Sequence, residues 1–212
     1  APDMIIAVDG PTASGKGTIA KGLAEHFGLP VLDTGLLYRA VGYQTQLNHG
    51  DPDNAADALA ACNFPASLLD DPALRFESTG SLASRASVHP GVRAALFQRQ
   101  VDFANQPGGA VLDGRDIGTV IAPDADAKLF VTANPEERAR RRHAEMRGRG
   151  VDVTFDAVLA DVHARDARDT GRADAPLLRA ADALLIDNSD MDKDAALAAA
   201  IAFVEERRKA RG

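Results

Sequence analysis

The sequence predicts an α/β fold, with one domain built on a buried parallel sheet and a small appended lobe. Two observations lead to this prediction. The chain has 212 residues, which is enough for one such domain. Short apolar runs, the first of them at residues 4–8, alternate with segments whose apolar residues recur every three or four positions. This alternation is typical of repeated β-α-β units.

A glycine-rich segment lies between the first apolar run and the first helical pattern. Glycines there let successive backbone N–H groups converge, and the following helix points its positive end at the same place. We therefore expect a phosphate-binding loop for a nucleoside triphosphate, with Lys16 on the β- and γ-phosphates. Because Gly17 follows Lys16, the hydroxyl that holds Mg²⁺ falls to Thr18. The loop consists of Gly10, Pro11, Thr12, Ala13, Ser14, Gly15, Lys16, Gly17 and Thr18. The alternative is a glycine-rich turn without a ligand.

The next two elements complete a first repeat. Apolar spacing predicts a helix over Lys16–Phe27 that Gly28 ends, then a short strand over 29–32 and a helix from Thr34 onward. Thr34 and Arg39 would then lie near the carboxyl end of the second strand. In an open parallel sheet, ligands bind at that edge.

The middle of the chain is mainly helical in pattern. Helices are expected over 52–62 and 90–103, and a short strand over 74–77. The polar stretch 78–89 gives no clear prediction. A buried strand over 109–112 leads into 113–119, whose three charges and two glycines at the end of a strand mark a candidate site.

The second half of the chain is rich in arginine. A strand is expected over 127–132, then an arginine-dense helix that Asn134 caps, and then a second helix over 154–169. Arg165, Arg168 and Arg172 are three and four residues apart and project from neighbouring angles. The alternative for this hairpin is a solvated surface with Glu–Arg pairs. A strand over 183–186 and a helix over 195–204 close the predicted fold.

Composition restricts the class of partner. The net charge of −7 argues against a nucleic acid or an anionic membrane as partner. Of 24 basic residues, 5 are lysines and 19 are arginines, and the planar arginine fork suits phosphate and carboxylate. The single cysteine, Cys62, excludes an internal disulfide and fits a reducing cytoplasm. No targeting segment is visible, and the histidines lack metal-ligand spacing. We expect a soluble cytoplasmic protein without a metal held by protein alone.

Five segments carry a family resemblance. They read GPTASGKGT at 10–18, DTGLLYR at 33–39, DGRDIGTV at 113–120, ERARRR at 137–142 and RDARDTGR at 165–172. In order and spacing they resemble the motif series of the bacterial cytidylate kinase family, through nearly the whole chain. The third and fifth segments together are specific to this family among nucleoside monophosphate kinases.

The resemblance implies a P-loop NTPase fold with a five-stranded parallel sheet and helices on both faces. It divides a single domain into a core (about 1–34, 109–142 and 173–212), a monophosphate-binding lobe (about 35–108) and a helical lid (about 143–172). The lobe is shortened relative to the better-known members. The implied reaction is ATP-dependent phosphorylation of CMP and dCMP by direct in-line transfer, in a monomer, with Mg²⁺ bound together with ATP.

The resemblance also assigns site residues. Thr34 and Arg39 correspond to contacts with the acceptor phosphate, and Ser84 and Arg93 to contacts with the acceptor nucleotide. Arg115 and Asp116 correspond to the acceptor phosphate and base region. Arg165, Asp169 and Arg172 correspond to the hinge side of the lid, and Arg141 to an ATP contact. The expected catalytic cations are Lys16, Arg115, Arg165 and Arg172.

Physical chemistry agrees with this assignment. Two anionic substrates repel each other, so several fixed cations are needed where the phosphoryl group moves. The attacking phosphate oxygen is already anionic at pH 7, so no general base is required.

Two alternatives stay open. Another P-loop kinase, acting on uridylate, thymidylate or shikimate, would share the loop and the lid, and turnover with each acceptor would separate these. A nonenzymatic P-loop switch protein would keep Lys16 and Thr18 but would not need the arginines of lobe and lid.

Overall fold

A computed structural model of the protein describes residues 3–212. Its centre is a five-stranded sheet with the order β2-β3-β1-β4-β5, and every neighbouring pair is parallel. The strands are β1 (Met4–Asp9), β2 (Val31–Asp33), β3 (Gly109–Gly114), β4 (Ala127–Thr132) and β5 (Leu184–Asp187). The expected five-stranded parallel sheet is confirmed. The strand order, which the sequence did not predict, places β3 between β1 and β2. The carboxyl ends of these three strands therefore lie next to one another at the same edge of the sheet.

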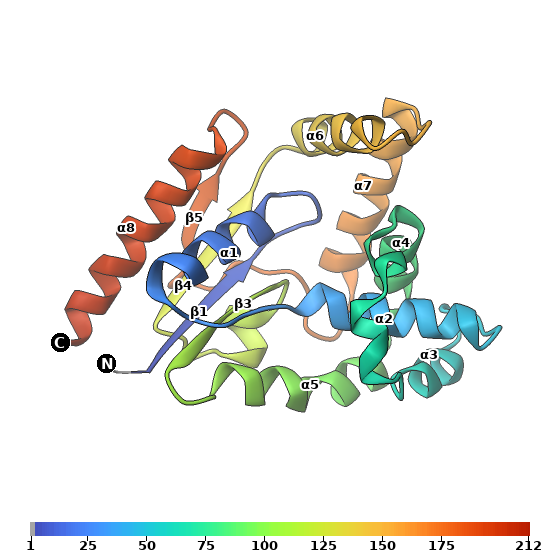
Figure 1. The fold of residues 1–212 in the computed structure, drawn as a ribbon, viewed down its shortest axis with the longest axis horizontal. Coiled ribbons are helices and arrows are strands. Elements are labelled where there is room, and N and C mark those ends of the chain that lie inside the picture. Colours follow the sequence, from blue (N-terminus) through green and yellow to red (C-terminus); the bar gives the residue numbers. More distant parts are fainter. Residues whose placement is uncertain (1–2) are drawn as a thin grey trace.

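Eight α-helices are described (Figure 1). They are α1 (Lys16–Phe27), α2 (Thr34–Leu47), α3 (Ala55–Ala61), α4 (Glu77–Ala86), α5 (Pro90–Ala104), α6 (Pro135–Gly148), α7 (Phe155–Gly171) and α8 (Lys193–Arg211). Three shorter helical turns are η1 (Ala66–Asp70), η2 (Pro72–Arg75) and the π-helical η3 (Ile117–Ile121).

Helices cover both faces of the sheet. On one face, Ile6 of β1 belongs to a core that includes Leu23 of α1 and Val204 of α8. On the other face, Leu112 of β3 belongs to a core that includes Ala104 of α5 and Ile121 of η3. The alternation of side chains along a strand separates these two cores. The expected helices on both faces are thereby confirmed, and they leave the carboxyl edge of the sheet open to ligands.

Helices α2–α5 form a lobe beside the sheet with a core of its own, which contains Leu37, Leu74 and Leu96 (Figure 1). Gly42 of α2 lets α4 approach closely, because a methyl group there would lie 2.7 Å from the backbone nitrogen of Ala83. We call this unit the α2–α5 lobe.

The strand predicted over 74–77 is wrong. Turn η2 ends at Arg75, and α4 begins at Glu77. Asp71 fixes the turn by accepting a hydrogen bond from the backbone N–H of Ala73 at 2.9 Å. A four-residue apolar pattern cannot distinguish a strand from a turn. Most of 78–89, which gave no prediction, is helix α4, whose buried residues Thr79, Gly80, Ala83 and Ala86 follow a helical spacing.

Helices α6 and α7 pack as a hairpin through Ala139, Val158 and Val162. Asn134 caps α6 and Thr154 caps α7, each by accepting a backbone N–H three residues ahead. The predicted lid boundary at 143 falls inside α6, which runs unbroken. Over residues 3–212, none of the helices has both the length and the apolar character required to cross a membrane.

Candidate active site

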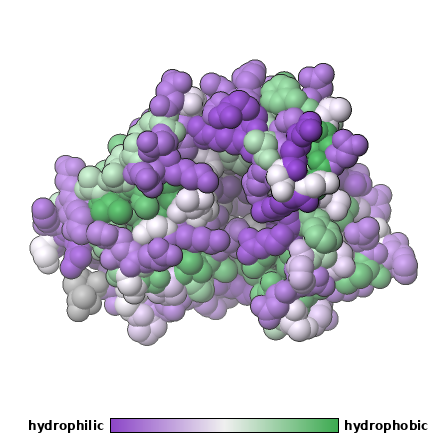
Figure 2. All heavy atoms as spheres, turned by 45° about the horizontal axis from the view of Figure 1, so that its top comes forward, coloured by the Kyte–Doolittle hydropathy of each residue, from purple (hydrophilic) through white to green (hydrophobic). Residues whose placement is uncertain are grey.

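A cavity lies at the carboxyl edge of the sheet, between the phosphate loop, the α2–α5 lobe and α7. Hydrophilic residues surround the hollow in the space-filling view (Figure 2). Twelve of the residues predicted from the sequence line it. They are Thr12, Ala13, Lys16, Gly17, Thr34, Arg39, Ser84, Arg93, Arg115, Arg165, Asp169 and Arg172. The fold therefore brings together residues from five separate stretches of the chain.

The phosphate loop has the shape expected from its glycines. Gly15 adopts the left-handed conformation, with φ 86°, directly before α1 begins at Lys16. Gly10 lies against β4, where a methyl group would be 2.1 Å from the carbonyl oxygen of Val131. No side chain fits at that distance, so glycine is required there. The loop thus presents its backbone and the amino end of α1 to the cavity.

Lys16 lies among charges at the base of the cavity. Its Nζ is 3.5 Å from the carbonyl oxygen of Pro11. Burial, and then the charge of the nearby Arg115, lower the pKa of Lys16 to about 8, while Asp113 opposes the shift. Lys16 therefore stays cationic below about that pH, and a phosphate anion would hold it charged over a wider range.

Two carboxylates that received no site role of their own from the sequence face Lys16. Asp33 and Asp113 end the neighbouring strands β2 and β3 and lie directly opposite each other in the sheet. Burial, and then the charge of Asp33, raise the pKa of Asp113 to about 7. Each of these residues directly follows a predicted strand, which could have indicated a site. That the two strands are neighbours, however, is known only from the strand order in the structure.

Asp9, the last residue of β1, holds the backbone of the segment that follows β3. It accepts hydrogen bonds from the backbone N–H groups of Ile117 at 2.9 Å and Gly118 at 2.8 Å. Burial raises its pKa to about 6, against the lowering effect of these two bonds. Asp9 thereby ties the end of β1 to the DGRDIGT segment.

Two side chains hold the phosphate loop in place by donating hydrogen bonds to its backbone carbonyl oxygens. Arg138 donates to the carbonyl oxygen of Thr12 at 3.2 Å and forms a two-pronged pair with Asp166 at 2.9 and 2.6 Å. Asn188, after β5, donates to the carbonyl oxygen of Ser14 at 2.9 Å. Sequence reasoning missed Arg138 and Asn188, because their partners are far away in the chain.

Arg141, predicted as an ATP contact, does not line the described part of this cavity. Its guanidinium donates to Asn188 at 2.9 and 2.7 Å and to Glu137 at 3.0 Å. It therefore stands next to the loop, through Asn188, and its role toward ATP stays a prediction.

The α2 side of the cavity carries Thr34 and Arg39. The Thr34 hydroxyl donates to the carbonyl oxygen of Asp113 at 2.7 Å, which links α2 to β3. Arg39 donates to the carbonyl oxygen of Leu74 at 2.7 Å. Both side chains come from the first two turns of α2, as expected from the strand before it.

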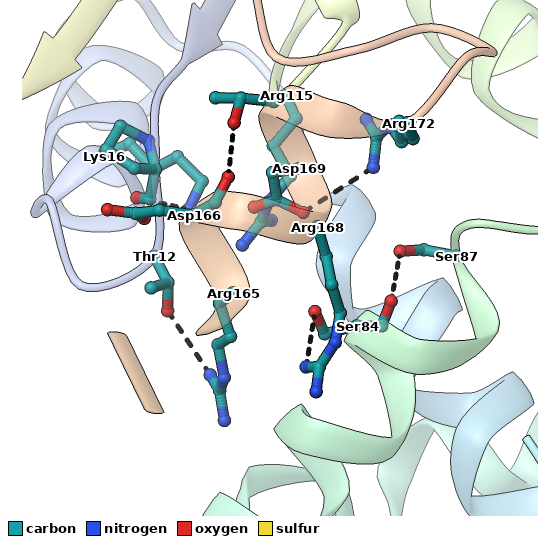
Figure 3. A network of polar contacts seen from close by, with 12 residues as sticks. Thr12, Lys16, Ser84, Ser87, Arg115, Arg165, Asp166, Arg168, Asp169 and Arg172 are labelled. Carbon is teal, nitrogen blue, oxygen red and sulfur yellow. Dashed lines mark hydrogen bonds and ion pairs between the residues drawn. The ribbon is translucent and has the colours of Figure 1, made fainter. Parts of the chain in front are cut away.

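Helix α7 brings its polar side chains across the cavity (Figure 3). Arg165 donates to the hydroxyl of Thr12 at 3.3 Å. Asp169 accepts from Nε of Arg115 at 2.5 Å and lies 3.7 Å from Arg172. The carboxylate of Asp169 thus holds two cations from different segments. Arg165 and Arg172 are therefore buried and do not fit the alternative of a solvated surface. Arg140 and Arg149, in contrast, have exposed side chains and form the Glu–Arg pairs that this alternative expects.

Ser84 meets the same helix. Its hydroxyl accepts from Arg168 at 3.3 Å, and its carbonyl oxygen accepts from the hydroxyl of Ser87 (Figure 3). Ser84 and Ser87 both line the cavity. The α2–α5 lobe and α7 therefore meet on this side.

Arg93 and Asp116 form a buried ion pair at the border with a second, more apolar cavity. Arg93 lines both cavities, whereas Asp116 is found on the second. The guanidinium also faces the ring of Tyr38 at 5.6 Å and lies 3.6 Å from Asp174. Asp116 and Arg93 are therefore neighbours, as expected. That they contact the base of the acceptor stays a prediction.

Thr18 lies in the first turn of α1 and is exposed. In residues 3–212, no three His, Cys, Asp or Glu side chains form a group that could hold a metal. The carboxylates of Asp33 and Asp113 nevertheless line the cavity, and Thr18 is one residue beyond Gly17, which also lines it. Mg²⁺ bound mostly by phosphates and water needs only one or two such oxygens, so the donor set fits that ion.

The charges of the cavity select an anion. Seven cationic side chains and three carboxylates line it, although the whole chain carries a net charge of −7. A phosphate loop on one wall and arginines on the other define a P-loop kinase. Residues 6–206 match the family model described as cytidylate kinase, and the chain belongs to that family.

Relatives of known name agree. The cytidylate kinase of Xanthobacter autotrophicus is 57% identical over 98% of this chain and 100% of its own length. The cytidylate kinase of Caulobacter sp. is 54% identical over 97% of this chain and 95% of its own length. A crystal structure of an uncharacterized protein from Eubacterium ventriosum superposes with a TM-score of 0.54 at 17% identity, over 96% of this chain and 99% of its own. That likeness concerns the fold alone.

Proposed function

We propose that this protein transfers the γ-phosphoryl group of ATP to CMP and dCMP, which gives ADP with CDP or dCDP. One observation carries the proposal. The cavity has a phosphate loop on one wall and acceptor-side cations on the opposite wall, so two phosphorylated substrates can meet in it. Membership of the cytidylate kinase family supports the same reaction and the choice of base.

Lys16, Arg39, Arg115, Arg165 and Arg172 supply the positive charge for the transfer. An oxygen of the acceptor phosphate attacks the γ-phosphorus, a new P–O bond forms, and the bond to the β-phosphate oxygen breaks in line with it. The acceptor oxygen is anionic, so no residue has to remove a proton. Catalysis then consists of positioning, charge stabilisation and exclusion of water.

The hydroxyl of Thr18 would hold the Mg²⁺ that binds together with ATP. The ion supplies charge neutralisation on the phosphates. The remaining phosphate charge is met by the backbone N–H groups of the loop and by Lys16.

The acceptor lies between the α2–α5 lobe and α7. Thr34, Arg39 and Arg115 bind its phosphate. Ser84, Arg93 and Asp116 face its base, and Asp169 lies on the hinge side with Arg165 and Arg172. All these residues come from one chain, so the site needs no second copy. We also propose that the protein is a monomer and works in the cytoplasm.

A coupled assay tests the reaction. ATP is offered with CMP, dCMP, UMP, dTMP or shikimate, and ADP formation is followed. Faster turnover with CMP and dCMP than with the other acceptors supports the proposal. Preference for UMP or dTMP would instead favour a kinase for another base. Slow ATP hydrolysis that no acceptor stimulates would favour a switch protein.

A further inference from the structure

One carboxylate connects three helices beside the active site. Glu77 is the first residue of α4. Its Oε1 accepts a hydrogen bond from Nη2 of Arg165 at 2.8 Å, and its Oε2 accepts one from Nε of Arg142 at 2.7 Å. Arg165 belongs to α7 and Arg142 to α6. Nη2 of Arg142 also donates to Oε2. Glu77 thus joins the α2–α5 lobe to both helices of the hairpin through three charge-assisted hydrogen bonds.

Glu77 lies behind these arginines. Arg142 and Arg165 line the cavity, and Glu77 is not among the described residues that do so. Arg165 directs another of its nitrogens, Nη1, to the hydroxyl of Thr12 in the phosphate loop at 3.3 Å. The carboxylate therefore holds the outer side of each guanidinium and leaves their inner sides to the cavity.

Three guanidinium groups crowd together at this point. A methyl group on Gly80 would lie 2.9 Å from Nη2 of Arg165 and 3.0 Å from Nη2 of Arg39. Burial, and then the charges of Arg165 and Arg142, lower the pKa of Arg39 to about 10. Such like charges repel one another, so the cluster needs a counter-ion. Glu77 supplies it for two of the three.

Asp161 also faces Arg165, but it cannot replace Glu77. It lies 2.9 Å from Nε of Arg165, one helical turn earlier on the same helix. A pair within α7 does not fix α7 relative to α4 or α6. Glu77 is the partner that comes from the lobe.

We propose that Glu77 is a positioning residue for phosphoryl transfer, holding Arg142 and Arg165 in the orientation in which they meet the transferred phosphoryl group. The proposal rests on the proposed function. Glu77 belongs to the lobe that binds the monophosphate. The lobe on the acceptor side therefore sets the positions of Arg142 and Arg165, which belong to the hairpin.

The test is Glu77→Gln, which keeps the shape and removes the charge. The nitrogen of the new amide is an N–H donor that faces a guanidinium donor, so one arginine loses its hydrogen bond to the side chain of residue 77. Misplaced catalytic groups can cost about 100-fold. We expect kcat with ATP and CMP to fall by about 10- to 100-fold, while the KM for ATP changes little. Glu77→Asp, which keeps the charge on a shorter arm, should recover part of kcat.

Glu145→Gln is the matched control. It removes another Glu–Arg pair of α6, with Arg149 at 2.7 Å, where both side chains are exposed. Its kcat should equal that of the parent protein. In Arg142→Ala and Arg165→Ala backgrounds, Glu77→Gln should cost less than it does in the parent, because it acts through these arginines.

Three results would overturn the inference. One is a kcat for Glu77→Gln equal to that of Glu145→Gln. A second is a loss that is fully additive with both arginine variants. A third is a lowered melting temperature with normal kcat in the cold, which would show a structural role only. If the parent protein phosphorylates no monophosphate, the proposed function fails as well, and the two failures are thereby distinguished.

Discussion

The buried pair of Arg93 and Asp116 gives the sharpest test of base selection. Their side chains are 6% and 7% exposed, and Oδ2 of Asp116 holds the guanidinium. A carboxylate beside a guanidinium presents an acceptor next to a donor, which matches the 4-amino group and N3 of cytosine. Uracil presents the opposite pattern at this edge, so it would meet repulsion in place of two bonds.

Asp116→Ala removes the acceptor for the 4-amino group. A hydrogen bond to a charged group contributes about 1.5–3 kcal/mol, which is a factor of about 10 to 150. The ratio of kcat/KM for CMP to that for UMP should fall by this factor. Arg93 would keep only Asp174, at 3.6 Å and 49% exposed. The free energy of unfolding should therefore drop by about 3 kcal/mol, the lower end for a broken buried pair.

Both quantities are measurable on one preparation. Steady-state rates with CMP and with UMP at saturating ATP give the ratio, and urea unfolding followed by circular dichroism gives the stability. Asp174→Ala is the control, because it removes the half-exposed partner of Arg93 and should leave the ratio unchanged. If Asp116→Ala lowers both kcat/KM values equally, Asp116 holds Arg93 and does not read the base.

Four further predictions concern the loop, the hairpin and the lobe. Lys16→Ala should lower turnover by about 100-fold or more with an unchanged melting temperature, and near-normal activity would show that the loop is not the ATP site. In the parent protein, kcat/KM for ATP should decline above pH about 8, because Lys16 then loses its proton; a flat profile to pH 9.5 would contradict this. Arg165→Ala and Arg172→Ala should lower kcat more than they raise the KM for ATP, with Arg165→Lys a poor rescue because the fork is lost; a lowered melting point with unchanged kcat would point to a structural role. Gly42→Ala should destabilise by about 1–3 kcal/mol, since its methyl group would meet the backbone of Ala83 at 2.7 Å, and an unchanged urea midpoint would refute that packing argument.

Local patterns predicted most of the fold. The phosphate loop was found because a strand, a glycine-rich turn and a helix start are consecutive in the chain, and Gly28 ends α1 in the left-handed conformation, as expected. The prediction failed at 74–77, where a turn and the start of α4 were taken for a strand. There the pattern was too short to decide, and burial of Leu74 in the lobe core set the outcome.

The candidate site was predicted in part. The sequence indicated Lys16, Thr34, Arg39 and Arg115, because these polar or charged residues follow the ends of predicted strands. The fold places all four on one cavity. Asp33 received no site role of its own, because its approach to Asp113 requires β2 and β3 to be neighbours. Arg141 was expected at ATP, but its described contacts are with Glu137 and Asn188.

The sequence by itself determined most of the helices and strands, the phosphate loop and the kinds of charge available, because each of these depends on residues close together in the chain. Only the tertiary structure decided which charges become partners. Glu77 meets Arg142, which is 65 positions away in the chain, and Arg165, which is 88 positions away. Asn188 reaches Ser14 of the phosphate loop, which is 174 positions away. An ion pair or hydrogen bond depends on a separation of a few ångströms, and at such sequence distances that separation is set by strand order and helix packing.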